Sequence, residues 1–236
     1  MSDVYAPPQP PPPQPPSSSG YDVLRPFVFL FDDPRWMPKV MLGGLFVLLS
    51  TVVAGIPFLL GYIARMTRNI IAGDPRPLPE WDDLGEFFGE GLVLFAVSLI
   101  YMLPVSVLSI LVAIPAAFVD NVTQPGLHEV GAGIVTCASC VVSMLSFVIT
   151  LILPAAMLRV IATRRFGAAF ELREVWVFIT RNIGNYLLAL VTELVAYILS
   201  FAGLALLCVG VIFTFFWAVL VTGYAFATVW RAAPQS

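Results

Sequence analysis

Long apolar segments dominate this chain and constrain what it can fold into. They cover residues 40–64, 91–119, 130–158, 185–207 and 209–230. A helix of about 20 apolar residues crosses the hydrocarbon core of a bilayer, and these segments reach or exceed that length. A helix also satisfies its backbone hydrogen bonds internally, as lipid requires. The sequence therefore predicts an all-α fold, a polytopic integral membrane helical bundle with interfacial amphipathic helices.

The composition also favours a location in the membrane. Hydrophobic residues make up 59% of the 236 residues and charged residues 11%, whereas a soluble domain has about 25% charged residues. The mean hydropathy is +0.91. A soluble protein of this size has no core large enough for so much apolar surface, so lipid is expected to cover it. The net charge of −3 argues against a nucleic-acid partner.

The two ends of the chain differ from the membrane domain, which we place at residues 21–231. Residues 1–20 are rich in proline and serine, which favours a disordered, Pro-rich tail over a recognition motif. Residues 232–236 are a short tail. No signal peptide is expected, because no basic stretch precedes a short apolar run.

The first apolar segment admits two interpretations. An interfacial helix that ends near Asp32 is expected before it, with Lys39 at the level of the headgroups. Residues 40–64 either cross the membrane once, with a kink at Pro57, or turn back at Gly55-Ile56-Pro57 as a re-entrant element. Each arm of a re-entrant element would be about 22 Å long, too short for a full crossing. The positive charges that precede the segment slightly favour the re-entrant form.

Arginines distinguish the polar segments and predict the topology. Residues 65–90 contain three arginines and residues 159–184 contain five, whereas residues 120–129 contain neither Lys nor Arg. Cytoplasmic loops carry the excess of Lys and Arg. We therefore expect the two arginine-rich segments and the C-terminus in the cytoplasm, with the protein in the cell inner (cytoplasmic) membrane.

The first arginine-rich block leads into an acidic helix. We expect Asp82 or Asp83 to cap this helix. Its charged face is expected to carry Asp83, Glu86 and Glu90, and its other face Trp81, Leu84, Phe88 and Leu92. The block is either a salt-bridged cap that joins two membrane segments or a site for anionic lipid or a partner. Capping and charge pairing favour the first interpretation.

Residues 170–182 predict a second amphipathic helix at the membrane interface. Glu171, Glu174 and Arg181 are expected on one face, and Leu172, Val175, Trp176 and Ile179 on the other. A further carboxylate, Glu193, lies inside an apolar segment, where a charge is unfavourable and suggests a function. The candidate binding residues are Arg65, Arg68, Arg76, Trp81, Asp82, Asp83, Arg164, Arg165 and Glu193.

No set of residues predicts catalysis or a cofactor. Cys137 and Cys140 form a Cys-x-x-Cys inside an apolar segment, where small residues more often serve helix packing than redox chemistry. His128 is the single histidine, so a zinc site is not expected. We therefore expect no metal, no cofactor and no enzyme activity.

The stretch between the first two apolar segments resembles the signature of a known family. The residues that carry the resemblance are Gly61, Tyr62, Arg65, Arg68, Asn69, Gly73, Asp74, the run Leu78-Pro79-Glu80-Trp81-Asp82-Asp83, Gly85, Phe88, Gly91 and Leu92. They are similar to domain-of-unknown-function family 4013, an uncharacterised family of prokaryotic multi-pass membrane proteins. The resemblance covers about residues 21–231 and implies an integral membrane protein. It implies no activity and no catalytic residue.

Two functions remain as hypotheses. The first is a non-enzymatic scaffolding protein that binds membrane lipids, or another membrane or cytoplasmic protein, through residues 65–90 and 159–184. The second is a small transporter or permease-like protein that uses Glu193. A water-filled cavity that reaches Glu193 would favour transport, whereas an exposed polar groove would favour binding.

Overall fold

The structure is a computed structural model that describes residues 21–119, 121, 124–205 and 210–233. The predicted tail at residues 1–20 and the last residues of the chain lie outside this part. The described residues form helices and connecting turns, with no strand. In chain order the helices are α1 (Arg25–Val28), η1 (Phe29–Asp32), α2 (Trp36–Leu49), η2 (Ser50–Val52), α3 (Ile56–Ala72), α4 (Leu84–Val119), α5 (Pro125–Thr163), η3 (Phe166–Phe170), α6 (Leu172–Arg181), α7 (Ile183–Ser200), η4 (Phe201–Ala205) and α8 (Gly210–Ala232).

The fold confirms the predicted all-α membrane bundle. Four helical segments in the described part are long and apolar enough to cross a bilayer: Leu84–Val119, Gly126–Thr163, Ile183–Ala205 and Gly210–Ala232. The last two form the hairpin that the sequence predicts near residues 203–210. The helical segment expected to end near Asp32 is present as α1 and η1, and its location at the interface stays a prediction.

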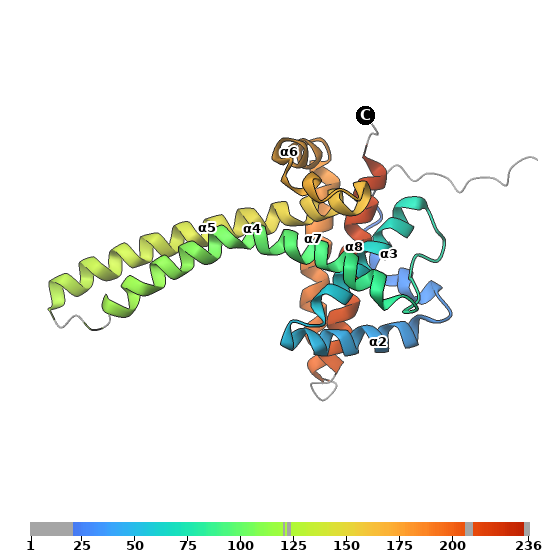
Figure 1. Ribbon diagram of the computed structural model, residues 1–236, viewed down its shortest axis with the longest axis horizontal. Helices are drawn as coiled ribbons and strands as arrows, with labels where there is room; N and C mark the ends of the chain where they lie inside the picture. The colour runs from blue at the N-terminus through green and yellow to red at the C-terminus, as the bar shows by residue number, and fades with distance from the viewer. Residues whose placement is uncertain (1–20, 120, 122–123, 206–209, 234–236) are drawn as a thin grey trace, which may run out of the picture.

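Two helical hairpins run crosswise to each other. Figure 1 shows α4 and α5 side by side as a long arm that projects away from α7 and α8. The arm helices contain 36 and 39 residues, which corresponds to about 54 and 58 Å at 1.5 Å per residue. α3 packs along the base of α4, and α2 packs along α8. The polar segments therefore meet where the base of the arm joins the rest of the bundle.

Residues 40–64 are broken into two helices. The chain turns between η2 and α3 at Val53, whose φ of 67° is in the left-handed region. Pro57 lies in the first turn of α3, where a missing N–H leaves no intrahelical hydrogen bond unmade. The break falls where Gly55-Ile56-Pro57 predicts one, and the proline starts a helix instead of kinking it.

Small residues bring α2 close to α8. A β-carbon on Gly43 would lie 2.1 Å from the Phe216 ring, and one on Gly44 would lie 2.5 Å from the Phe213 ring. Glycine leaves room for both rings, so α2 rests on the aromatic side of α8. This contact places Lys39, in the first turns of α2, beneath the loop that follows α3.

Candidate functional site: the polar end of the bundle

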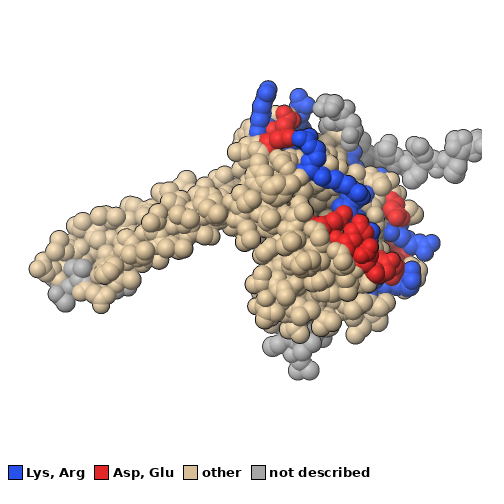
Figure 2. Space-filling model, in the orientation of Figure 1, with Lys and Arg blue, Asp and Glu red and all other residues tan. Residues whose placement is uncertain are grey.

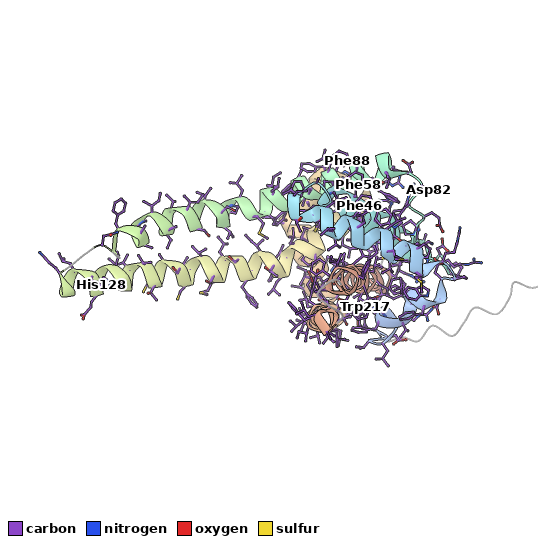
Figure 3. All side chains as sticks on the ribbon, turned by 90° about the horizontal axis from the view of Figure 1, so that it is seen from below. Phe46, Phe58, Asp82, Phe88, His128 and Trp217 are labelled. Atoms are coloured by element: carbon purple, nitrogen blue, oxygen red, sulfur yellow. The ribbon has the colours of Figure 1, made fainter. Side chains whose placement is uncertain are left out.

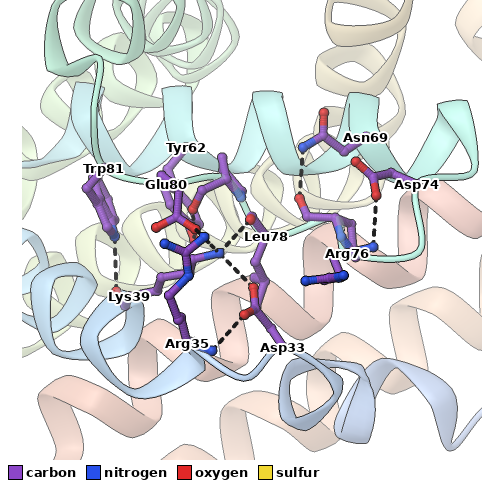
Figure 4. Close-up of polar contacts among 12 residues, drawn as sticks. Asp33, Arg35, Lys39, Tyr62, Asn69, Asp74, Arg76, Leu78, Glu80 and Trp81 are labelled. Atoms are coloured by element: carbon purple, nitrogen blue, oxygen red, sulfur yellow. Dashed lines mark hydrogen bonds and ion pairs between the residues drawn. The ribbon is translucent and has the colours of Figure 1, made fainter.

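The loop of residues 73–83 closes over the N-terminal helices (Figure 4). Gly73 ends α3 in the left-handed conformation with φ of 82°, which glycine adopts without a steric penalty. The Asp74 carboxylate then accepts a hydrogen bond from the Arg76 backbone N–H at 2.8 Å. The Asn69 side chain donates to the Pro77 carbonyl at 3.0 Å. These contacts fold the loop back toward α3 and leave Arg76 at its exposed surface.

Lys39 is the buried centre of this region. Its residue is 4% exposed, and its ammonium donates to the Asp33 carboxylate at 2.6 Å and to the Leu78 carbonyl at 2.8 Å. It also forms an ion pair with Glu80 at 2.8 Å. The charge of Lys39 is therefore satisfied within the protein, whereas its expected position at headgroup level stays a prediction. These contacts of the buried ammonium hold α2 against the loop.

Asp33 is held in its ionised form. Burial alone would raise its pKa, but the hydrogen bonds from the Lys39 ammonium and from the Arg35 backbone N–H outweigh burial, so the pKa of Asp33 lies below its usual range. Both hydrogen bonds require the charged carboxylate. Asp33 is therefore a carboxylate near neutral pH.

Trp81 points inward, under the loop. Its indole N–H donates to the Lys39 carbonyl at 3.0 Å, and its ring stacks on Tyr62 with centroids 4.2 Å apart. The Tyr62 hydroxyl donates to the Pro79 carbonyl at 3.0 Å. Trp81 precedes α4 and is not on its apolar face, so the sequence prediction for this residue is wrong. The aromatic packing extends through Phe46 and Phe58 to Phe88 (Figure 3).

The acidic start of α4 has the predicted structure. Asp83 caps the helix, because its carboxylate accepts the Glu86 backbone N–H at 3.0 Å. Ion pairs join Arg65 to Glu86 and Arg68 to Glu90, both between α3 and α4. The pairing of the arginines with this helix is therefore as expected, whereas Asp82 remains exposed beside it.

An open pocket lies between α3, α4 and α5. It has a volume of about 190 Å³ and is lined by Ala64, Arg68, Glu90, Val93, Leu94, Val160, Ile161 and Arg164. Two arginines and one glutamate thus line the pocket together with apolar residues. Figure 2 shows that charged side chains gather at this end of the bundle and not along the arm. Of the predicted binding residues, the structure brings Arg68 and Arg164 together here.

Arg164 and Arg165 have different surroundings although they are adjacent. Arg165 lies 3.6 Å from the Glu171 carboxylate, which also accepts a hydrogen bond from Arg159 at 2.7 Å. Arg164 follows the last residue of α5 with φ of 54°. None of the ion pairs among the described residues involves Arg164. Arg164 thus lines the pocket without an ion-pair partner among the described residues.

The second amphipathic helix is present as α6, and the bundle covers only part of its apolar face. Val175, Phe178 and Ile179 are buried. Leu172 and Trp176, expected on the same face as Val175 and Ile179, are each 60% exposed. The apolar arc of the helix is wider than the surface that the bundle covers.

Glu193 lies apart from the arginines. It is half-buried on α7, about 15 Å along the helix from Ile183 at 1.5 Å per residue. No residue of α7 lines the pocket described above. The role of Glu193 in transport stays a prediction.

The remaining reactive side chains lie on the arm. Cys137 and Cys140 are exposed on α5, and His128 lies near the tip of the arm (Figure 3). Cys208 is outside the described residues. Within that part of the chain, no group of three or more His, Cys, Asp and Glu side chains is placed to hold a metal ion.

Sequence reasoning missed Lys39, Asp33 and Tyr62 as parts of the polar end. Lys39 contacts the Leu78 carbonyl and Tyr62 contacts the Pro79 carbonyl, which are 39 and 17 positions away, and no local spacing indicates such pairs. The one available signal was a lysine and an aspartate six residues apart beside an apolar run.

These features define a class: an all-helical integral membrane protein whose polar end is closed by a loop held over a buried lysine. Residues 44–209 match the family described as "Protein of unknown function (DUF4013)". The match covers more than half of the chain, so the chain belongs to this family, as the resemblance indicated. Comparison with curated proteins gives no match, and neither does comparison with solved structures.

Proposed function

We propose that this protein binds anionic lipid headgroups, without catalysing a reaction, in the pocket between α3, α4 and α5. The observation that carries the proposal is the convergence of Arg68, from α3, and Arg164, directly after α5, on one open pocket with apolar walls. The guanidinium of arginine is suited to bidentate contact with phosphate oxygens.

The walls of the pocket fit the rest of a lipid molecule. Val93, Leu94, Val160 and Ile161 lie beside the two arginines. A phospholipid has a matching arrangement: a charged headgroup is followed by the glycerol and the first methylenes of the acyl chains, which are apolar. A soluble anion gains nothing from these walls, so the pocket favours an amphiphile.

The two arginines have separate roles in this proposal. Arg68 is 17% exposed in its side chain and is held by Glu90, so its guanidinium is fixed in position before a ligand arrives. Arg164 supplies a second charge that is not neutralised by the described residues. The pocket therefore carries a net positive charge near neutral pH.

The backbone at Arg164 supports a role for its side chain. A residue other than glycine in the left-handed region is disfavoured by about 1 kcal/mol, and glycine is the residue that most often ends a helix in this conformation. An arginine at φ of 54° is thus not explained by helix termination alone.

We also propose that this polar end faces the cytoplasm, at the inner leaflet of the cell inner membrane. The arginine excess of residues 65–90 and 159–184 supports this orientation, and the cytoplasmic leaflet holds the anionic lipids that attract such segments. A protein partner that recognises the same two segments would extend the function to scaffolding.

The test uses the full-length protein in mild detergent, with phosphatidylglycerol as the probe and phosphatidylcholine as the neutral lipid. Native mass spectrometry counts bound lipids, and the melting temperature reports stabilisation by binding. Arg164→Gln should lose most of the phosphatidylglycerol effect. Arg76→Gln makes the same charge change on the exposed loop and should behave like the wild-type protein.

Two results would overturn the proposal. One is equal phosphatidylglycerol binding by Arg164→Gln and the wild-type protein. The other is an equal response of the wild-type protein to phosphatidylcholine. Both variants change exposed side chains, so size-exclusion profiles should match that of the wild-type protein and exclude a folding defect.

A further inference from the structure

An apolar edge of α6 is left uncovered by the bundle. Leu172 and Trp176 are each 60% exposed. They are four residues apart and so lie one above the other on the same side of the helix. At 100° per residue, this edge lies between the buried side of Val175 and Ile179 and the exposed Arg173.

The position of α6 is fixed by the helix that follows it. One residue, Asn182, separates the end of α6 from the start of α7. Asn182 is 9% exposed. Its side chain donates to the Phe178 carbonyl at 2.9 Å, and its carbonyl accepts the Tyr186 N–H at 2.8 Å. This corner is therefore hydrogen-bonded on both sides and does not act as a free linker.

α6 lies across the end of a membrane helix. Figure 1 shows α6 nearly end-on, whereas α7 and α8 run vertically in the same view. If α7 crosses the bilayer, α6 lies roughly parallel to the bilayer surface. The exposed apolar face of α7 begins directly after the corner, at Ile183 and Leu187, which are 49% and 52% exposed.

We propose that α6 is an in-plane anchor whose Leu172–Trp176 edge inserts into the boundary between headgroups and acyl chains of the same bilayer. One residue separates this helix from α7, whose exposed apolar face is covered by lipid in a membrane. Tryptophan favours this boundary because its ring is apolar and its N–H is polar. Arg173 borders the edge on its exposed side, and its positive charge is complementary to an anionic leaflet. This inference is independent of the lipid pocket.

The occupant is therefore lipid and not a second protein surface. An interfacial helix of this kind has a strongly charged face opposite a broad apolar face, unlike a helix that is apolar all round and spans the bilayer. α6 has both faces, with Arg173, Glu174 and Arg181 on the charged one.

The experiment places a spin label at single cysteines in the full-length protein, reconstituted in vesicles of phosphatidylcholine and phosphatidylglycerol. The background carries Cys137→Ala, Cys140→Ala and Cys208→Ala. The test positions are Leu172→Cys and Trp176→Cys, and the matched control is Glu174→Cys on the opposite side of α6. Collision with oxygen reports the lipid phase, and collision with a water-soluble nickel chelate reports the aqueous phase.

Labels at positions 172 and 176 should collide with the nickel chelate about threefold less than the label at 174, and more with oxygen, as expected for a helix in the interface. Equal exposure of all three labels to the chelate would show that the edge faces water and would overturn the proposal. Shielding of positions 172 and 176 from both reagents would show that protein covers the edge, and would overturn it as well.

Discussion

Gly91 of α4 lies directly against the Pro57 carbonyl of α3. A β-carbon at Gly91 would be 1.6 Å from the Pro57 oxygen. The relationship is reciprocal one turn away, because a β-carbon at Gly61 would be 1.9 Å from the Phe87 oxygen. Both obstacles are backbone atoms, which move only if the whole helix moves. These two glycines therefore set the distance between α3 and α4, and with it the alignment of Arg65 and Arg68 with their carboxylates.

The first prediction concerns this helix contact. Gly91→Ala should destabilise the protein by about 1–3 kcal/mol, the range for an overpacked interior, because α3 and α4 must separate. Gly89→Ala is the matched control: nothing lies within 4 Å of its β-carbon, and alanine is the better helix former. Thermal unfolding in detergent measures both. Equal melting temperatures for the two variants would contradict the close contact.

The second prediction concerns the buried lysine. Lys39→Ala leaves the Asp33 carboxylate buried without its main partner, and breaking a buried ion pair in this way costs about 3–5 kcal/mol. Arg35→Ala removes an ion pair to Glu80 in which the Arg35 side chain is 71% exposed, and such a pair contributes about 1 kcal/mol or less. The melting temperature of Lys39→Ala should therefore fall well below that of Arg35→Ala. A similar decrease in the melting temperature of both variants would show that the buried ion pair of Lys39 contributes no more to stability than the exposed pair of Arg35.

The third prediction is a dependence of stability on pH. The pKa of Asp33 in the folded protein lies below its usual range, so the folded state binds protons less readily than the unfolded state. The stabilisation is fully present above the unfolded pKa of about 3.9 and is lost as the pH falls through the lower folded value. The melting temperature of the wild-type protein should decline below about pH 4.

The double variant Asp33→Asn/Lys39→Met isolates this contribution. It removes both charges of the pair, so neither is left buried alone. Its melting temperature should decline less steeply than that of the wild-type protein over the same acid range. Parallel curves for the two proteins would assign the acid sensitivity to other carboxylates.

Local patterns in the sequence account for much of this fold. The spanning helices follow from uninterrupted apolar runs, and the helix that starts after Asp83 follows from its capping residue and acidic first turn. The ion pairs of Arg65 and Arg68 could be expected from the sequence, because one loop, residues 73–83, joins the two helices that carry the opposite charges. Each of these features depends on residues that are close in the chain.

Other parts of the polar end depend on contacts between distant residues. Lys39 resembles an interfacial lysine in sequence, and only the folded loop shows that the Leu78 carbonyl and Asp33 enclose it. Trp81 points inward because its ring stacks on Tyr62 and its indole N–H donates to the Lys39 carbonyl. Neither residue is near Trp81 in the chain. On α6, periodicity gives the apolar arc but not how much of it the bundle covers. Exposure of Leu172 and Trp176 is a property of the packing and not of the helix alone.

The last prediction separates stability from lipid binding at Arg164. Glycine adopts the left-handed conformation of this residue without a steric penalty. In neutral lipid, Arg164→Gly should therefore leave the free energy of unfolding unchanged or raise it by about 1 kcal/mol, and the melting temperature should stay the same or rise accordingly. Phosphatidylglycerol should nevertheless stabilise this variant much less than the wild-type protein. Val53→Gly relieves the other left-handed residue, with φ of 67°, at a position outside the pocket, and should keep the full response to phosphatidylglycerol. If Arg164→Gly gained stability and also kept that response, the guanidinium would have no part in binding. A variant that is more stable alone and less responsive to anionic lipid is the outcome that a strained binding residue requires.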